Sequence, residues 1–143
     1  MPVPPEPHAA MPLRVLYVED NRINAILFEE ALRLRTDVEL RLAENGEEAL
    51  QQVQQWRPHM LVLDSHLPGM NGCELLGALR RVQGLAEAPA FMCSADASPD
   101  DVRRAGEAGF IGYWPKPIDL AQVLGDLDGV CLRLRTERAV PGA

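Results

Sequence analysis

The stretch HMLVLD (59–64) decides the fold, because four consecutive apolar residues lead directly into a single aspartate. A strand with one face in water alternates apolar and polar residues, whereas an uninterrupted apolar run is typical of a strand buried on both faces. Strands of that kind belong to parallel sheets that helices cover on each side. The stretch therefore predicts a central strand of an α/β protein, with Asp64 at its carboxyl end.

Short apolar runs alternate with longer amphipathic runs on both sides of this stretch. The predicted strands are 13–18, 38–43, 59–64, 88–94 and 110–114, and the predicted helices are 21–35, 45–56, 71–82, 98–109 and 119–135. Strand–helix–strand units of this length form parallel sheets with right-handed crossovers. The expected fold class is α/β, with a doubly wound five-stranded parallel sheet. If the strand order is 2-1-3-4-5, strands one and three lie side by side at its centre.

The two ends of the chain differ from this central part. Residues 1–12 hold five of the twelve prolines. Proline fixes φ and lacks an amide donor, so we expect a flexible tail or linker there. The single domain is expected at 13–135, because 143 residues suffice for one core and not for two ordinary ones. Residues 136–143 are expected to be a flexible C-terminal tail, with no effector domain after it.

Composition excludes several classes of protein. The net charge of −7 argues against nucleic acid as a partner, since proteins that bind it usually carry a basic face. No run approaches the roughly 18 apolar residues of a membrane-spanning helix, so membrane insertion is not expected. The three cysteines form no CxxC pair, which favours reduced thiols in the cytoplasm over a zinc site or a disulfide framework.

Polar residues follow four of the five predicted strands. Glu19 and Asp20 follow the first strand, Asp64 ends the third, Ser94 ends the fourth, and Lys116 follows the fifth. Carboxyl ends of parallel strands meet at one edge of the sheet, where ligands bind. We therefore expect the three carboxylates to converge on one pocket, with the hydroxyl and the ammonium on its other side.

Such a pocket needs a cation. Two unit charges about 4 Å apart repel by about 4 kcal/mol at an effective dielectric constant of about 20. Oxygen ligands without His or Cys at ligand spacing favour Mg²⁺. Lys116 is the only lysine in the chain, and lysine supplies a compact point charge where arginine supplies a planar fork. Carboxylates, Mg²⁺, ammonium and hydroxyl together suit phosphoryl transfer, with a carboxylate as acceptor.

Four stretches of the chain resemble the receiver domain of bacterial two-component response regulators. They are VLYVEDNRIN (15–24), MLVLDSHLPGMNG (60–72), MCSADASPDDVRRAGEAGF (92–110) and GYWPKPI (112–118). Each stretch alone is a weak signal, but the combination is specific and covers nearly all of 13–135. The resemblance implies a flavodoxin-like fold with the strand order 2-1-3-4-5.

The resemblance also implies roles at the acidic pocket. Asp64 is the phosphoacceptor in this reading. Glu19, Asp20 and Asp64 hold Mg²⁺, for which Mn²⁺ can substitute, and the backbone carbonyl of His66 is a further ligand.

The remaining roles belong to groups that contact the phosphoryl group or respond to it. Ser94 is the switch hydroxyl, and Tyr113 is the switch aromatic. Lys116 contacts the phosphoryl oxygens, and the Lys116–Pro117 peptide is expected to be cis.

The implied function is a phosphorylation-controlled switch in the bacterial cytoplasm. A histidine kinase or a histidine phosphotransfer protein donates the phosphoryl group, and the domain catalyses its own phosphorylation and dephosphorylation without being a conventional enzyme. The output is altered binding to a downstream protein, or self-association, through the fourth helix, fifth strand and fifth helix. The chain is either a stand-alone regulator or the C-terminal receiver of a hybrid sensor kinase.

Two other functions are compatible with parts of the pattern. A degenerate receiver could serve as a docking module that does not depend on phosphorylation, although such a module has no need for the complete set of Glu19, Asp20, Asp64 and Lys116. A small Mg²⁺-dependent phosphatase would need a general acid two residues after its nucleophile, where this chain has His66, and a cap over the substrate.

Overall fold

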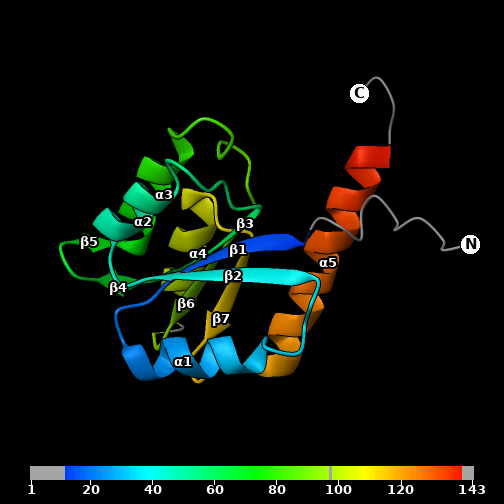
Figure 1. The fold of residues 1–143 in the computed structure, drawn as a ribbon. Helices are drawn as coiled ribbons and strands as arrows, with labels where there is room; N and C mark the ends of the chain where they lie inside the picture. Colours follow the sequence, from blue (N-terminus) through cyan, green and yellow to red (C-terminus); the bar gives the residue numbers. More distant parts are fainter. Residues whose placement is uncertain (1–11, 97, 140–143) are drawn as a thin grey trace, which may run out of the picture.

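Five parallel strands form one sheet at the centre of the computed structural model, which describes residues 12–96 and 98–139 (Figure 1). The strands are β1 (Leu13–Val18), β2 (Val38–Ala43), β3 (Met60–Asp64), β6 (Ala90–Ser94) and β7 (Gly112–Pro115). Their order is β2-β1-β3-β6-β7. Since β6 and β7 are the fourth and fifth strands of the prediction, the predicted order 2-1-3-4-5 is confirmed.

Helices cover both faces of this sheet (Figure 1). They are α1 (Arg22–Ala31), α2 (Gly46–Gln52), α3 (Gly72–Arg80), α4 (Pro99–Ala108) and α5 (Leu120–Ala139). Apolar side chains of α2, α3 and α4 share one core with the sheet, and those of α1 and α5 share the other. The fold is thus the doubly wound α/β arrangement expected from the alternating pattern.

The central strand β3 explains why its sequence is apolar throughout. Leu61 and Leu63 belong to the core under α2, α3 and α4, whereas Met60 and Val62 belong to the core under α1 and α5. Successive side chains of a strand point to opposite faces, so a strand with helices on both sides must be apolar at every position. All five residues of β3 are buried, including Asp64 at its end.

A short hairpin follows β3 that the sequence analysis did not predict. Strands β4 (His66–Leu67) and β5 (Met70–Asn71) pair antiparallel across a two-residue turn. The turn consists of Pro68 and Gly69, and Gly69 has φ of +76°. Proline followed by glycine with positive φ is the sequence of a type II turn. The hairpin follows Asp64 and Ser65 in the chain and connects β3 to α3.

Three helix ends also differ from the prediction by four residues. Helix α2 ends at Gln52 instead of 56. Helix α1 ends at Ala31 instead of 35, and Arg35 instead forms a two-bond ion pair with Asp37, at 2.8 Å for each bond. Helix α5 continues to Ala139, so its predicted end at 135 is wrong, and the predicted C-terminal tail overlaps this helix. Residues 135–139 contain no proline or glycine, and the next proline is Pro141.

The other parts of the predicted tails, 1–11 and 140–143, lie outside the described residues. Within 12–96 and 98–139, none of the helices has the length and apolar character needed to cross a membrane. Cys73, Cys93 and Cys131 are free thiols.

Candidate functional site

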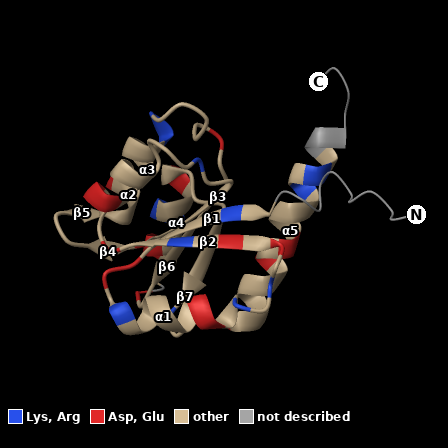
Figure 2. Ribbon diagram, viewed as in Figure 1, with Lys and Arg blue, Asp and Glu red and all other residues tan. Residues whose placement is uncertain are grey.

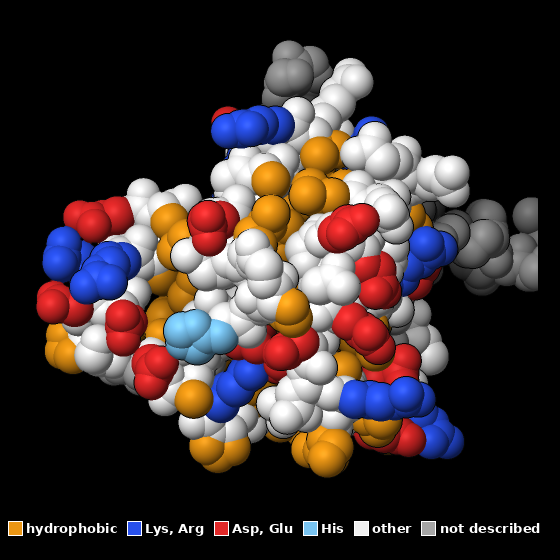
Figure 3. Space-filling model, turned by 90° about the vertical axis from the view of Figure 1, so that its left-hand side faces the viewer, with side chains coloured by type: hydrophobic (Ala, Val, Ile, Leu, Met, Phe, Trp, Pro, Cys, Tyr) orange, Lys and Arg blue, Asp and Glu red, His pale blue; other side chains and the backbone are white. Residues whose placement is uncertain are grey.

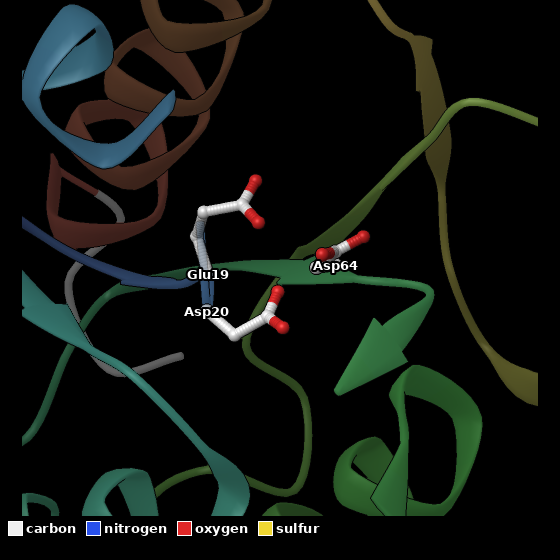
Figure 4. A group of neighbouring side chains, drawn as sticks. All are labelled: Glu19, Asp20 and Asp64. Carbon is white, nitrogen blue, oxygen red and sulfur yellow. The ribbon is translucent and has the colours of Figure 1, made fainter. Parts of the chain in front are cut away.

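The candidate site lies where β1, β3, β6 and β7 end. Glu19 and Asp20 follow β1 in the acidic segment that leads into α1 (Figure 2), and Asp64 ends the neighbouring strand β3. One ligand atom from each of these residues lies within 4.8 Å of the others. Figure 4 shows the three carboxylates gathered at this edge of the sheet. The predicted convergence of the acids is therefore confirmed by the geometry.

Glu19 is a buried carboxylate that accepts hydrogen bonds from three donors. Its Oε1 accepts from the Tyr17 hydroxyl at 2.9 Å and from Lys116 Nζ at 2.7 Å, and its Oε2 accepts from the backbone N–H of Asn21 at 3.2 Å. Burial opposes ionisation, but these hydrogen bonds, led by that of Lys116, outweigh it and lower the pKa of Glu19. Glu19 is therefore ionised at neutral pH, whereas the neighbouring Asp20 is exposed to solvent.

Asp64 has less compensation for its burial than Glu19. Its side chain lies 3.3 Å from Lys116 Nζ, and its Oδ1 accepts a long hydrogen bond, 3.5 Å, from the backbone N–H of His66. Burial, and then the neighbouring Glu19, raise the pKa of Asp64 to about 6. Glu19 is the more strongly ionised of the pair because it takes the shorter contact with Lys116.

Lys116 is the cation that joins these carboxylates. Burial acts to lower its pKa, but the contacts with Glu19 and Asp64 outweigh burial and raise it. Its backbone N–H donates to the carbonyl of Ser94 at 2.8 Å, which fixes the residue beside β6. The Lys116–Pro117 peptide is cis, as the resemblance implied.

The residues at the site fit a divalent cation. Three carboxylates, whose oxygens are hard ligands, lie together. The single ammonium of Lys116 does not balance their combined charge. Such donors suit Mg²⁺ and ions like it. Burial is the main reason that the pKa of Asp64 is raised, and the neighbouring charge of Glu19 adds to it.

The predicted switch residues are connected through the backbone of Asp96. The Ser94 side chain is buried, and its Oγ accepts from the backbone N–H of Asp96 at 3.0 Å. The hydroxyl of Tyr113, a partly buried ring at the edge of the core under α2, α3 and α4, donates to the backbone carbonyl of Asp96. Ser94 and Tyr113 thus bond to the backbone N–H and the backbone carbonyl of the same residue, Asp96.

The mouth of the site carries exposed charged groups. Nε2 of His66 lies 3.1 Å from Oδ2 of Asp96, and both side chains are largely exposed. Figure 3 shows a histidine side chain between acidic and basic side chains on the face of the molecule that it draws. His66 follows Asp64 by two positions and Asp96 follows Ser94 by two, so the contact joins the two strand ends across the pocket.

Three residues of the site were missed by the sequence analysis. Tyr17 lies in the middle of an apolar strand, and nothing in the sequence alone distinguishes it from a core residue. Ser65 and Asp96 adjoin predicted site residues, and that proximity is the signal that could have drawn attention to them. The Oγ atoms of Ser65 and Ser94 lie 2.8 Å apart.

Comparison with known proteins identifies the class to which this fold and site belong. Residues 15–128 match the family described as response regulator receiver domain, and the chain belongs to that family. It is therefore a receiver domain of two-component signalling.

Individual relatives agree with this class. The chain is 39% identical over 120 residues to the sensor histidine kinase AruS of Pseudomonas aeruginosa, a match that covers 80% of this chain but only 12% of AruS. It is 33% identical over 112 residues to the chemotaxis protein CheY of the same species, covering 78% of this chain and 90% of CheY. The crystal structure of the Mn²⁺-bound form of the response regulator Rcp1 superimposes with a TM-score of 0.68 at 28% identity, covering 83% of this chain and 91% of that one.

Proposed function

We propose that Asp64 accepts a phosphoryl group from a phosphohistidine in a reaction that depends on a divalent cation, and that the modification changes which partner the domain binds. The observation that carries this proposal is the position of Asp64, a buried carboxylate 3.3 Å from Lys116 Nζ and within the acidic cluster. Burial of an ionised carboxylate lowers the stability of the fold. A site that keeps such a carboxylate beside a cation is therefore a candidate functional site.

The covalent step is a substitution at phosphorus. An oxygen of Asp64 forms a bond to phosphorus while the phosphorus–nitrogen bond of the donor breaks, and the departing imidazole takes a proton from solvent. With a pKa of about 6, Asp64 is mainly ionised at pH 7 and can act as the nucleophile. Lys116 neutralises charge on the phosphoryl oxygens, where positioning and electrostatics dominate the rate.

We propose Mg²⁺ as the cation, with Mn²⁺ as a substitute. Glu19, Asp20 and Asp64 would hold it, together with the backbone carbonyl of His66. When bound, the ion offsets the repulsion between the acceptor carboxylate and the phosphoryl oxygens. The Mn²⁺-bound form of Rcp1 supports a divalent cation at sites of this kind.

The response to phosphorylation runs through Asp96. The Ser94 hydroxyl moves toward a phosphoryl oxygen, and the backbone N–H of Asp96 is bonded to that hydroxyl. Tyr113 is bonded to the carbonyl of the same residue. A shift of Ser94 is thus passed to Tyr113, which follows the exposed Ile111 by two positions. The face formed by α4, β7 and α5 is the surface that we propose for a downstream protein or for self-association.

The phosphodonor protein has a different surface available. Ile23 and Leu27 of α1 are 69% and 62% exposed, and Ile26 is also exposed. A groove of about 190 Å³ runs between α1 and α5, and Lys116 and Pro117 form part of its lining. Exposed apolar side chains in one patch mark interaction sites. We propose that a histidine kinase or phosphotransfer protein docks on α1, in the bacterial cytoplasm, a reducing compartment in which the three thiols remain free.

The first experiment is intact-mass spectrometry after incubation with acetyl phosphate and Mg²⁺. We expect the wild type to gain one phosphoryl group, and we expect no gain with Asp64→Asn or with EDTA. Asp100→Asn, an exposed acid on α4, is the matched control and should gain the group normally. The alternative of a docking module predicts no gain from acetyl phosphate or from any kinase in a panel.

A further inference from the structure

Ser65 is the residue directly after Asp64, and its position is fixed by its own backbone. Its N–H donates to the carbonyl of Cys93 at 2.9 Å, and its carbonyl accepts from the N–H of Gly72 at 3.1 Å. A Cβ atom at Gly72 would lie 2.6 Å from the carbonyl oxygen of Asp64, so α3 begins in close contact with this segment. The Ser65 side chain therefore projects from a backbone that is bonded on both sides.

That side chain meets the predicted switch hydroxyl. Ser65 Oγ and Ser94 Oγ are 2.8 Å apart, and we call this contact the Ser65–Ser94 hydroxyl pair. Ser94 comes from β6 and Ser65 from the end of β3, two strands that pair in parallel. The phosphoacceptor Asp64 ends β3 and the switch hydroxyl of Ser94 ends β6. The pair therefore links the residue after the phosphoacceptor directly to the switch hydroxyl.

This hydrogen bond runs from Ser65 to Ser94. Ser65 Oγ donates to Ser94 Oγ, which also accepts from the N–H of Asp96. Ser94 is 1% exposed, and the Tyr113 hydroxyl is a further hydrogen-bond partner of its side chain. A serine hydroxyl has two lone pairs and one proton, so the two donors occupy both lone pairs of Ser94 Oγ. Ser65 is therefore the side chain that holds the Ser94 oxygen in this position.

We propose that Ser65 is a positioning residue that holds the Ser94 hydroxyl in the resting state, so that a phosphoryl oxygen on Asp64 must draw Ser94 away from Ser65 to receive a hydrogen bond from it. This inference rests on the proposed function of Asp64 and Ser94. Ser65 stabilises the unphosphorylated arrangement through one hydrogen bond that the phosphorylated arrangement gives up. Loss of the Ser65 hydroxyl therefore favours the phosphoryl-engaged state.

The test uses beryllofluoride as a phosphoryl analogue, with Mg²⁺ present, and follows its binding to the full chain by ¹⁹F NMR. Ser65→Ala should bind the analogue about two- to tenfold more tightly than the wild type, the range expected when one neutral hydrogen bond no longer has to break. Ser65→Thr keeps a hydroxyl and should stay within about twofold of the wild type.

The Ser94→Ala background separates a hydrogen-bond effect from a packing effect. Without the Ser94 hydroxyl, adding Ser65→Ala should change the affinity by less than about twofold, because no bond remains to be released. Equal or weaker binding by Ser65→Ala, or the same gain in both backgrounds, would overturn the inference for Ser65 alone. A wild type that neither binds the analogue nor gains a phosphoryl group would overturn the proposed function and this inference with it.

Discussion

The ammonium of Lys116 lies 2.7 Å from the carboxylate of Glu19, although 97 positions separate the two residues in the chain. The same ammonium lies 3.3 Å from Asp64. One cation thus joins two buried acids that follow different strands. The site is organised around this contact, because it decides which of the two acids is the more strongly ionised.

Removal of the Lys116 ammonium should destabilise the fold. Lys116→Met leaves two buried carboxylates without their cation, and we expect the free energy of unfolding at pH 7 to fall by about 2–3 kcal/mol. Urea unfolding in EDTA measures this change. The double variant Lys116→Met/Glu19→Gln should recover most of the loss, because it removes one of the two unpaired charges. Equal stability of the wild type and Lys116→Met would contradict the bridging role.

Replacement of Asp64 should have the opposite effect on stability. A carboxyl pKa raised from its ordinary value to about 6 means that the folded state disfavours the ionised form. The folded protein therefore loses stability through Asp64 as the pH rises from about 4 to about 6. Asp64→Asn should be more stable than the wild type by about 1–3 kcal/mol at pH 7 in EDTA.

The pH dependence makes this prediction specific to Asp64. The difference between Asp64→Asn and the wild type should be small near pH 4, grow up to about pH 6 and stay constant above it. The exposed control Asp100→Asn should change stability by less than about 0.5 kcal/mol throughout. A variant at Asp64 that is less stable than the wild type at pH 7 would show that burial and Glu19 do not destabilise the ionised form.

A divalent cation should stabilise the folded chain through the acidic cluster. We expect the thermal midpoint of the wild type to rise with Mg²⁺ concentration, as for any ligand that binds only the folded state. Asp20→Asn removes the most accessible of the three carboxylates and should weaken Mg²⁺ binding by about tenfold or more, measured by calorimetry. Asp100→Asn should bind as the wild type does, and equal affinity in Asp20→Asn would remove Asp20 from the ligand set.

The exposed apolar face of α1 should matter for a protein donor and not for a small one. Leu27→Glu places a charge in the proposed docking patch, and we expect phosphoryl transfer from a histidine kinase or phosphotransfer protein to slow by about tenfold. Phosphorylation by acetyl phosphate should be unchanged, because Leu27 is an exposed residue of α1 and not a member of the acidic cluster. The matched control is Val102→Glu, which changes an exposed apolar residue on α4. Equal slowing by both variants would argue against a specific docking face.

The sequence pattern was sufficient to predict a parallel sheet with the acids at one of its edges, and the resemblance to receiver domains supplied the strand order. A strand buried on both faces is apolar at every position, and the apolar run of β3 therefore predicted a central strand. Residues that follow parallel strands lie at one edge, so Glu19, Asp20, Asp64, Ser94 and Lys116 could be placed together from strand ends. These inferences depend on the apolar periodicity, which is a local property of the chain, and on the rule that parallel strands end at the same edge of a sheet.

Other features were decided by contacts that no local pattern encodes. Helix α1 ends at Ala31, and Arg35, which the prediction placed in that helix, bonds instead to Asp128 of α5 at 2.8 Å, 93 positions away. The ionisation of Asp64 depends on its burial and on its distance from Lys116, both of which exist only once the strands have assembled.

The hydroxyl pair of Ser65 and Ser94 illustrates the same limit. The sequence places Ser65 next to the phosphoacceptor, but serine after a strand is usually a turn residue. Only the pairing of β3 with β6 brings its Oγ to 2.8 Å from Ser94. The sequence determined which groups stand at the edge of the sheet, since apolar periodicity sets the strands. The tertiary structure decided which of those groups bond to one another, since hydrogen bonds and pKa values depend on distances of a few ångströms and on the exclusion of water.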